Sequence, residues 1–186
     1  MIKKFETLKI SMKEIEVKIL KINKKEIIRK LKNMGAKKSF DGVICGEYFD
    51  YPDDKLDKNN ELLRLRTAGE KVFLTYKGNL KKGKIKSCEE KEIEVSDYNT
   101  LKDIFLQIGL KVKKETMKKH RVSYSLGKTH FEIETPLENY NFIPPFMEIE
   151  STNAKIIYKY AKMLGYKENE CLNWTGNDVI KFYKKK

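Results

Sequence analysis

Residues 12–20 read MKEIEVKIL, and this stretch decides the fold that we expect. Its charged residues Glu14, Glu16 and Lys18 alternate with apolar residues, which is the two-residue period of a β-strand with one buried face. Two carboxylates on one face of a strand lie about 6.5–7 Å apart and repel each other by about 2.5 kcal/mol at an effective dielectric of about 20. A face of this kind either points to water or needs cations beside it.

The same alternation recurs along the chain in two similar halves, each of which contains a helix. Short turns through Gly69 and Gly127 predict two antiparallel hairpins. Helical spacing of apolar residues, with Asn, Asp and Gly at the ends, predicts helices over residues 24–34, 153–164 and 176–183. A further helix is expected after a cap at Asp97 or Asn99; it contains Leu101, Ile104, Phe105 and Ile108 and ends at Gly109. Strands are expected over residues 12–20, 38–50, 61–67, 71–77, 89–96, 112–125, 128–135 and 146–151, with a basic loop over 78–87.

Charged residues share one face of these strands, and apolar residues share the other. The amphipathic helices can cover the apolar faces, which would turn the charged faces inward. Closing eight antiparallel strands removes the exposed edges and leaves room for one small ligand. We therefore expect a single α+β domain over residues 1–186, a closed eight-stranded antiparallel barrel with helices packed outside. The alternative is an open sheet or sandwich whose charged faces meet water. The inward set comprises Glu14, Glu16, Lys18, Arg64, Arg66, Glu90, Glu92, Glu94, Lys119, Arg121, Glu132, Glu134, Glu148 and Glu150.

Composition narrows the setting of the protein. The 186 residues suit one domain, and the net charge of +13 attracts polyanions such as nucleotides, polyphosphate, nucleic acid or anionic lipid. Cys45, Cys88 and Cys171 are far apart and lack the spacing of a zinc site, so we expect reduced thiols. No apolar stretch is long enough for a signal peptide or a membrane span, which predicts a soluble, cytoplasmic protein without a membrane partner.

Carboxylates that are enclosed together need cations. Hard divalent ions such as Mg²⁺ or Mn²⁺ bind oxygen ligands of this kind and leave positions for phosphate oxygens. The lysines and arginines on the same faces can bind the remaining phosphate charge, with arginine contacting two oxygens at once. The pattern therefore predicts divalent metal ions and a ligand rich in phosphate.

Several short motifs follow one another along the chain. They are EIEVK at 14–18, YFD at 48–50, LRLR at 63–66, LTYKG at 74–78, the acidic strand through 90–94, KHR at 119–121 and FMEIE at 146–150. This ordered set resembles the CYTH superfamily, also called triphosphate tunnel metalloenzymes, whose ExExK signature matches EIEVK. The resemblance covers about residues 12–165, in a family that includes class IV adenylyl cyclases, thiamine triphosphatases and inorganic tripolyphosphatases.

The resemblance implies a tunnel in which carboxylates hold one or two divalent ions, Mg²⁺ or Mn²⁺, and basic residues hold a triphosphate. Tyr48 and Lys77 match a tyrosine and a lysine that family triphosphatases place near the attacking water. The implied metal ligands are Glu14, Glu16, Glu148 and Glu150, with Glu134 where the family usually has Asp. Further acidic residues of the interior would be Glu90, Glu92 and Glu94. The implied phosphate-binding residues are Lys18, Arg64, Arg66, Lys77, Lys119 and Arg121.

The chain departs from the family pattern at two places. Cys88 stands where relatives commonly have an arginine, so Lys84 or Lys86 would have to take its place. The loop between Glu134 and Glu148 is also longer than in many relatives. Both departures affect the choice of substrate more than the metal and triphosphate chemistry.

Three functions follow from the sequence. The first is metal-dependent hydrolysis of a triphosphate, whether inorganic tripolyphosphate, thiamine triphosphate or a nucleoside triphosphate. The second is a class IV adenylyl cyclase that converts ATP to cyclic AMP and pyrophosphate. We favour hydrolysis because no residues that read adenine can be identified. The third is a noncatalytic module that binds polyphosphate or nucleic acid; no RNA-recognition signature is present, so a specific nucleic-acid partner is not expected. A homodimer is compatible with each of the three.

Overall fold

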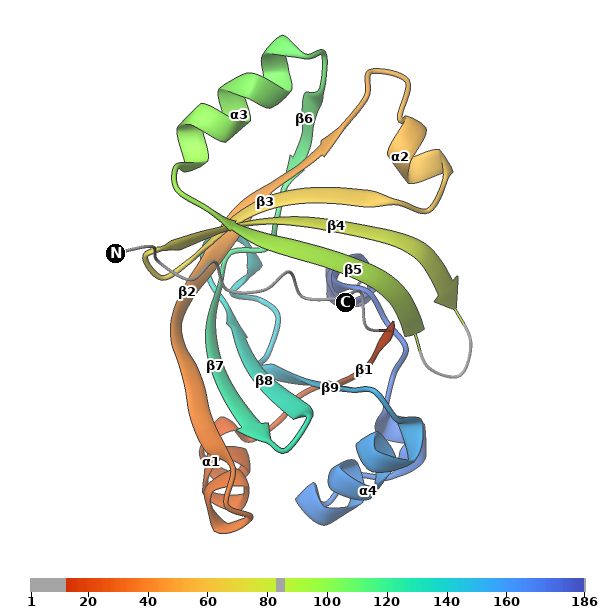
Figure 1. Ribbon diagram of the computed structural model, residues 1–186. Coiled ribbons are helices and arrows are strands. Elements are labelled where there is room, and N and C mark those ends of the chain that lie inside the picture. Colours follow the sequence, from red (N-terminus) through yellow and green to blue (C-terminus); the bar gives the residue numbers. More distant parts are fainter. Residues whose placement is uncertain (1–12, 83–85, 186) are drawn as a thin grey trace, which may run out of the picture.

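The computed structural model describes the backbone of residues 13–82 and 86–185 and the side chains of residues 15–78 and 88–185. These residues form one antiparallel sheet with helices around it (Figure 1). The strands are β1 (Lys13–Ile19), β2 (Lys37–Asp50), β3 (Leu62–Ala68), β4 (Lys71–Lys82), β5 (Lys86–Val95), β6 (Lys111–Glu115), β7 (Lys119–Leu126), β8 (Thr129–Pro136) and β9 (Phe146–Ser151). The helices are α1 (Lys24–Asn33), α2 (Lys55–Lys58), α3 (Tyr98–Gln107), α4 (Ala154–Leu164) and α5 (Gly176–Lys184), with 3₁₀ turns η1 (Glu138–Tyr140) and η2 (Glu168–Glu170).

The sheet is strongly curled. Neighbouring strands follow the order β3-β4-β5-β1-β9-β8-β7-β2-β6, and β2 also pairs with β3. Figure 1 shows β3, β4 and β5 as an upper wall and β1, β9, β8 and β7 as a lower wall, with β2 joining the two walls at one side. The long strand β2 can do this because it changes partners along its length: its first part pairs with β7, and its second part pairs with β3 and β6.

The predicted barrel is confirmed in part. The α+β class and a curled antiparallel sheet are as expected, but the structure is a half-barrel and does not show a fully closed barrel. Residues 37–43 of β2 have β7 on one side, whereas β3 begins to pair with β2 only at Ile44. On the other side of the curl, β1 reaches β5 through Lys13–Glu16.

Two predicted segments have different bounds, and one short helix was not predicted. The strand expected over 112–125 is interrupted at residues 116–118, so β6 and β7 pair with different parts of β2. The basic loop expected over 78–87 is wrong for most of its length, because β4 and β5 continue as a ladder beyond an irregularity at Gly78. The short helix α2 was not predicted. It begins after the buried carboxylate of Asp50, which accepts hydrogen bonds from the backbone N–H groups of Leu56 and Asp57.

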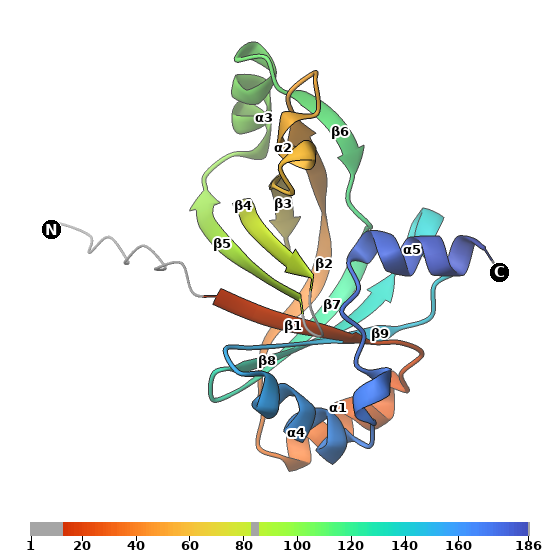
Figure 2. The ribbon, with the colours of Figure 1, turned by 90° about the vertical axis from the view of Figure 1, so that its right-hand side faces the viewer.

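Helices α1, α3 and α4 cover the convex side of the sheet, as the alternating pattern predicts. Helix α5 differs, because its Val179 packs with Phe146, which shares the inward face of β9 with Glu148. Beneath the lower wall, α1 and α4 pack on a core that includes the fully buried Phe131 and Ile149 (Figure 2). Above β3 and β4, the α3 residue Phe105 packs edge to face on Phe49, with ring centroids 5.1 Å apart. The outer face of β5 is an exception, because Ile93 there is 52% exposed.

Two smaller predictions concern cysteines and membrane spans. No disulfide joins the three cysteines, all of which lie in the described part of the chain. Among the described residues, the structure contains no helix that is both long and apolar enough to cross a membrane.

Candidate functional site

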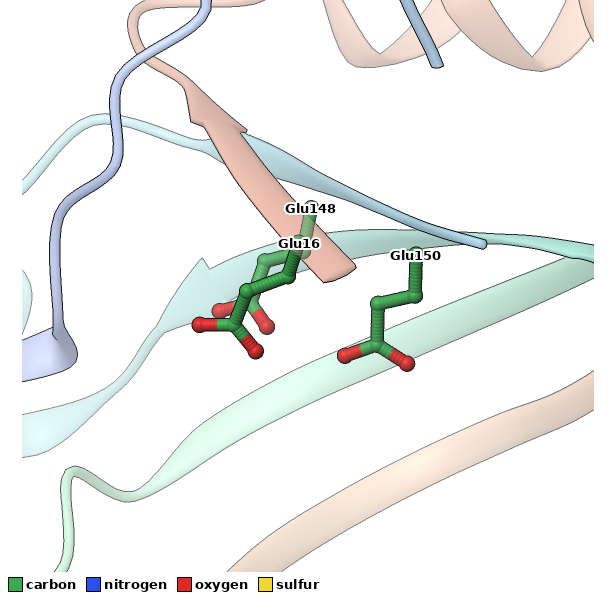
Figure 3. A group of neighbouring side chains, drawn as sticks. All are labelled: Glu16, Glu148 and Glu150. Carbon is green, nitrogen blue, oxygen red and sulfur yellow. The ribbon is translucent and has the colours of Figure 1, made fainter. Parts of the chain in front are cut away.

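The first group of carboxylates lies where β1 pairs with β9. Glu16 is directly opposite Glu150, and Lys18 is directly opposite Glu148. Direct cross-strand partners share a face, so these side chains point into the space between the two walls. Carboxylate oxygens of Glu16, Glu148 and Glu150 lie within 4.8 Å of one another. Figure 3 shows the three carboxylates directed to the same side of the sheet.

Lys18 is the cation built into this group. Its Nζ lies 3.0 Å from Oε1 of Glu16 and 3.1 Å from Oε1 of Glu148. Burial lowers the pKa of Lys18, but the two carboxylates outweigh burial and raise the pKa above its ordinary value. Lys18 therefore stays protonated at neutral pH and offsets part of the local negative charge.

The pKa values in the group indicate that positive charge is still in short supply. Burial, together with the charges of Glu132, Glu16 and Glu148, raises the pKa of Glu150 well above its usual range. The pKa of Glu148 is lowered: burial would raise it, but Lys18 and other nearby cations outweigh burial. Three carboxylates with only partial compensation have the chemistry of a hard divalent cation site. The donors present therefore fit Mg²⁺ or Mn²⁺.

A second group of carboxylates lies deeper along the lower wall. Glu132, Glu134 and Glu148 place one oxygen each within 4.8 Å of one another. Glu134 is fully buried and accepts a 2.6 Å hydrogen bond from Lys119 Nζ and a 2.7 Å hydrogen bond from Arg121 Nε. In this structure Glu134 is thus engaged with two cations, unlike Glu150, which forms no ion pair with a described cation.

Glu132 completes the second group. Its Oε2 lies 2.5 Å from a terminal nitrogen of Arg121, although the two do not align as a hydrogen bond. Burial raises the pKa of Glu132 to about 7, against the opposing charge of Arg121. The ion pair stabilises the charge of Glu132 without a hydrogen bond, because the charge interaction does not depend on alignment. Glu132 is therefore an acidic group whose charge depends on what occupies the site.

On the upper wall, basic side chains predominate over carboxylates. Arg66 donates a 2.9 Å hydrogen bond to Glu92, and Thr75 donates a 2.7 Å hydrogen bond to the same oxygen. Two residues beyond Thr75 on β4, Lys77 Nζ lies 2.6 Å from Glu90. Burial lowers the pKa of Lys77, but Glu90 outweighs it and the pKa is raised. Lys77 is therefore an ammonium at neutral pH, able to donate hydrogen bonds but not to accept a proton.

Unused hydrogen-bond donors also lie on the upper wall. The Nε atoms of Arg64 and Arg66 are buried without a hydrogen-bond partner. The pKa of Arg66 is lowered by burial and then by the like charges of Arg64 and Arg121, although a guanidinium remains charged at neutral pH. The influence of Arg121 on Arg66 connects β7 of the lower wall with β3 of the upper wall. The two walls therefore face one shared space.

The remaining predicted site residues are placed as follows. Tyr48 lies directly opposite Arg64 and has Lys114 Nζ 5.3 Å from its ring centroid. Glu94 lies at the edge, half exposed, with a 2.8 Å ion pair to Lys71. The side chain of Glu14 lies outside the described residues, as do those of Lys84 and Lys86. The backbone of Glu14 pairs directly with Cys88.

Sequence reasoning missed one residue of the site and gave one motif residue no role. Thr75 is fully buried and contacts both Arg64 and Glu92, and its parity with Lys77 on β4 was the available signal. Asp50 shares a motif with Tyr48, but its carboxylate binds backbone N–H groups of the following turn and not the shared space. No sequence signal distinguishes such a turn-stabilising Asp from a metal ligand.

Comparison with known proteins agrees with this arrangement. Residues 12–169 match the CYTH domain. A protein of Methanocaldococcus jannaschii named "Putative adenylate cyclase" is 28% identical over 148 residues, which are 78% of this chain and 80% of that protein. The solved structure of the PH1012 protein from Pyrococcus horikoshii OT3 is 30% identical with a TM-score of 0.73, covering 89% of this chain and 98% of that chain.

A more distant structure shares the fold. A Hippeastrum protein, described as a "Putative adenylyl cyclase" with a dominant triphosphatase activity, has a TM-score of 0.67 at 14% identity. The match covers 91% of this chain and 95% of that chain, and at this identity it shows the fold alone. Since the matched domain spans most of the sequence, the chain belongs to the CYTH domain family.

Proposed function

We propose that this protein hydrolyses a triphosphate with the help of a divalent metal ion, inside a tunnel formed by the curled sheet. One observation carries the proposal: a carboxylate group whose negative charge is only partly compensated faces a wall of arginines with unused donors across one space. A metal–triphosphate complex brings a cation for the carboxylates and an anion for the arginines. The pairing of β2 with β3 supports a tunnel, because it joins the two walls on that side.

The metal would be held by Glu16, Glu148 and Glu150. Glu14 would join them, because it lies two residues before Glu16 on the same face of β1. Mg²⁺ or Mn²⁺ fits carboxylate ligands best, and when bound it supplies charge stabilisation and a more acidic water. A second ion at Glu132 and Glu134 would have to compete with Lys119 and Arg121.

The cations would hold the phosphates. Arg64 and Arg66 offer planar groups that can contact two phosphate oxygens each, and Lys77 adds a point charge on the same wall. From the lower wall, Lys18, Lys119 and Arg121 are within reach of the same space. On binding, phosphate oxygens would replace the carboxylates of Glu90 and Glu92 as partners of these cations. The protein's own carboxylates thus keep the cations in position before the ligand arrives.

Hydrolysis also requires an oriented water. Tyr48 lies on β2, directly opposite Arg64, and can accept or donate a hydrogen bond through its hydroxyl. Lys77 remains protonated, so its part would be to orient the water or to stabilise the leaving phosphate. Neither residue requires a nucleobase, which is why we place hydrolysis first.

Cyclisation of ATP is the second candidate. The observation in its favour is the Methanocaldococcus jannaschii relative, whose name is that of an adenylate cyclase. The same metal and phosphate sites would serve if the ribose 3′-oxygen attacked the α-phosphorus and pyrophosphate left. Among the described residues, we identify none that would bind adenine.

Product analysis separates the candidates. Purified protein is incubated with tripolyphosphate, thiamine triphosphate or ATP, each with Mg²⁺ or Mn²⁺, and the products are separated by ion-exchange chromatography. We expect metal-dependent orthophosphate from tripolyphosphate. Cyclic AMP and pyrophosphate from ATP, without orthophosphate from tripolyphosphate, would replace hydrolysis by cyclisation. Tight binding without any turnover would leave a polyphosphate-binding module.

A further inference from the structure

The outer layer formed by α1 and α4 carries a large share of the protein's positive charge. The two helices contain eight lysines and arginines but a single acidic residue, Glu26. By comparison, α3 has one lysine and one aspartate, and α5 has two lysines and one aspartate. The excess on α1 and α4 is therefore a local property of this layer and not only a lysine-rich composition.

The exposed side of α4 combines lysines with apolar side chains. Lys155, Lys159 and Lys162 follow the spacing of one helix face, and all three are exposed. Beside them, Ile156 is 37% exposed and Met163 is 53% exposed. These two residues are seven positions apart, so they form a stripe next to the lysines.

Helix α1 extends the basic surface. Lys25, Arg29 and Lys32 are exposed and again follow the spacing of one helix face. Glu26, the one acidic side chain, already forms a 2.7 Å ion pair with Lys30. None of the six outward cations of the two helices forms an ion pair with a described residue, so their charge is available to a partner.

The position of the layer leaves the candidate site accessible. Figures 1 and 2 place α1 and α4 side by side beneath the lower wall, on the convex side of the sheet. The carboxylates and arginines lie on the concave side, between the two walls. A partner seated on the helical layer would therefore not block the space between the walls.

We propose that the α1–α4 layer docks on the surface of an anionic lipid bilayer. Six outward cations match a negatively charged surface, and each contributes by attraction to the anionic headgroups. Ile156 and Met163 favour a bilayer over nucleic acid, because they can enter the region between headgroups, whereas a phosphate backbone gives apolar side chains nothing to contact. The lysine stems beside them would cover apolar surface while their ammonium groups stay at the headgroups.

This docking is independent of the proposed hydrolysis. It also differs from a membrane span, since it needs no long apolar segment. The sequence-based expectation of no membrane partner rested on the lack of such a segment and does not bear on a surface contact. The bilayer would hold the enzyme by its helical layer, with the space between the walls open to the solvent.

Vesicle flotation tests the proposal with the full chain. Wild-type protein is mixed with vesicles of phosphatidylcholine alone or with roughly one-third phosphatidylglycerol, at low and high salt. We expect flotation only with the anionic vesicles, and less of it at about 0.5 M salt, where charges are more strongly screened. Each cation near an anionic bilayer strengthens binding by about fivefold, so the triple variant K155Q/K159Q/K162Q should bind about 100-fold more weakly.

A control variant and a second test variant show whether the effect is specific to this surface. The triple variant K58Q/K91Q/K128Q loses the same charge from exposed positions elsewhere and should float like the wild type. The double variant Ile156→Ser with Met163→Ser keeps every cation and should also lose binding. Equal losses in both lysine triple variants, full binding by the Ser variant, or tighter binding to RNA than to vesicles would each overturn the proposal. Unchanged thermal midpoints and unchanged phosphate release in all variants separate loss of docking from loss of fold or activity.

Discussion

The two walls of the curled sheet use the same residue types in different proportions. Among the described side chains, the upper wall sets Arg64, Arg66 and Lys77 against two inward carboxylates, Glu90 and Glu92. The lower wall sets three cations against five inward carboxylates, which are Glu16, Glu132, Glu134, Glu148 and Glu150. The upper wall thus has capacity for an anion and the lower wall has capacity for a cation.

The difference teaches how one sheet can bind a metal and a triphosphate together. Each wall compensates most of its own charge, so the protein without ligands avoids a large self-repulsion. The uncompensated charge is positive on the upper wall and negative on the lower wall. A metal–triphosphate complex can neutralise both, because its phosphates are anionic and its metal ion is cationic. Changing the charge of one wall should therefore damage one partner's binding more than the other's.

Removing a charge from Glu148 should have the largest effect, because this residue belongs to both carboxylate groups. Glu148→Gln keeps the size of the side chain, and we expect metal-dependent turnover to fall by at least about 100-fold. Glu16→Gln should behave similarly. Phosphate release at saturating Mn²⁺ measures the effect, with Glu168→Gln on the exposed η2 turn as the matched control. Wild-type turnover in a folded Glu148→Gln protein would remove the lower wall from the metal site.

Arg66→Ala should damage the upper wall alone. Loss of charge-assisted hydrogen bonds to phosphate should weaken tripolyphosphate binding by about 10- to 100-fold. Mn²⁺ affinity measured without triphosphate should stay the same. Calorimetric titration of each ligand checks both statements, and Lys91→Ala on the outer face of β5 is the control. An equal loss of affinity for both ligands would contradict the assignment of triphosphate to the upper wall and metal to the lower wall.

Glu150→Gln should separate stability from metal binding. Because burial and neighbouring carboxylates already raise the pKa of Glu150, a neutral Gln should leave the metal-free protein as stable as the wild type or slightly more stable. In the wild type, Mn²⁺ at about 100 times its dissociation constant should raise the thermal midpoint by about 5–10 °C. The variant should lose most of that rise. A marked drop in the stability of the metal-free variant would contradict the claim that Glu150 is repelled by the neighbouring carboxylates.

Asp50→Asn should have the smallest effect on the site and so sharpens the comparison. The carboxylate of Asp50 stabilises the turn into α2 and lies outside both walls' ligand-binding groups. We expect a loss of about 1–2 kcal/mol in the free energy of unfolding, measured by urea titration. Affinities for Mn²⁺ and tripolyphosphate should stay close to wild type. A large loss of either affinity would place Asp50 in the site.

The sequence predicted the charged face well because strand parity is a local property. Glu148 and Glu150 share a face for the same reason as Glu14 and Glu16, and no tertiary information is needed to see it. The direct pairing of Glu16 with Glu150 was not readable, since register between distant strands depends on the whole sheet.

Other features depended on tertiary structure in the same way. The break between β6 and β7 follows from β2 changing partners, which no pattern within residues 111–126 reveals. The ladder continues beyond Gly78, although the sequence of residues 79–82, NLKK, lacks the alternation that marks a half-buried strand. Ile93 was expected to be covered, but the helices leave the outer face of β5 open.

Tripolyphosphate titration with and without Mn²⁺ tests most directly whether the upper wall binds the triphosphate and the lower wall binds the metal. In the wild type, we predict that Mn²⁺ strengthens tripolyphosphate binding, because the ion links the ligand to the lower wall. Glu150→Gln should keep the metal-free affinity and lose the strengthening, whereas Arg66→Ala should lose affinity under both conditions. Identical tripolyphosphate affinity with and without Mn²⁺ in the wild type would contradict the account.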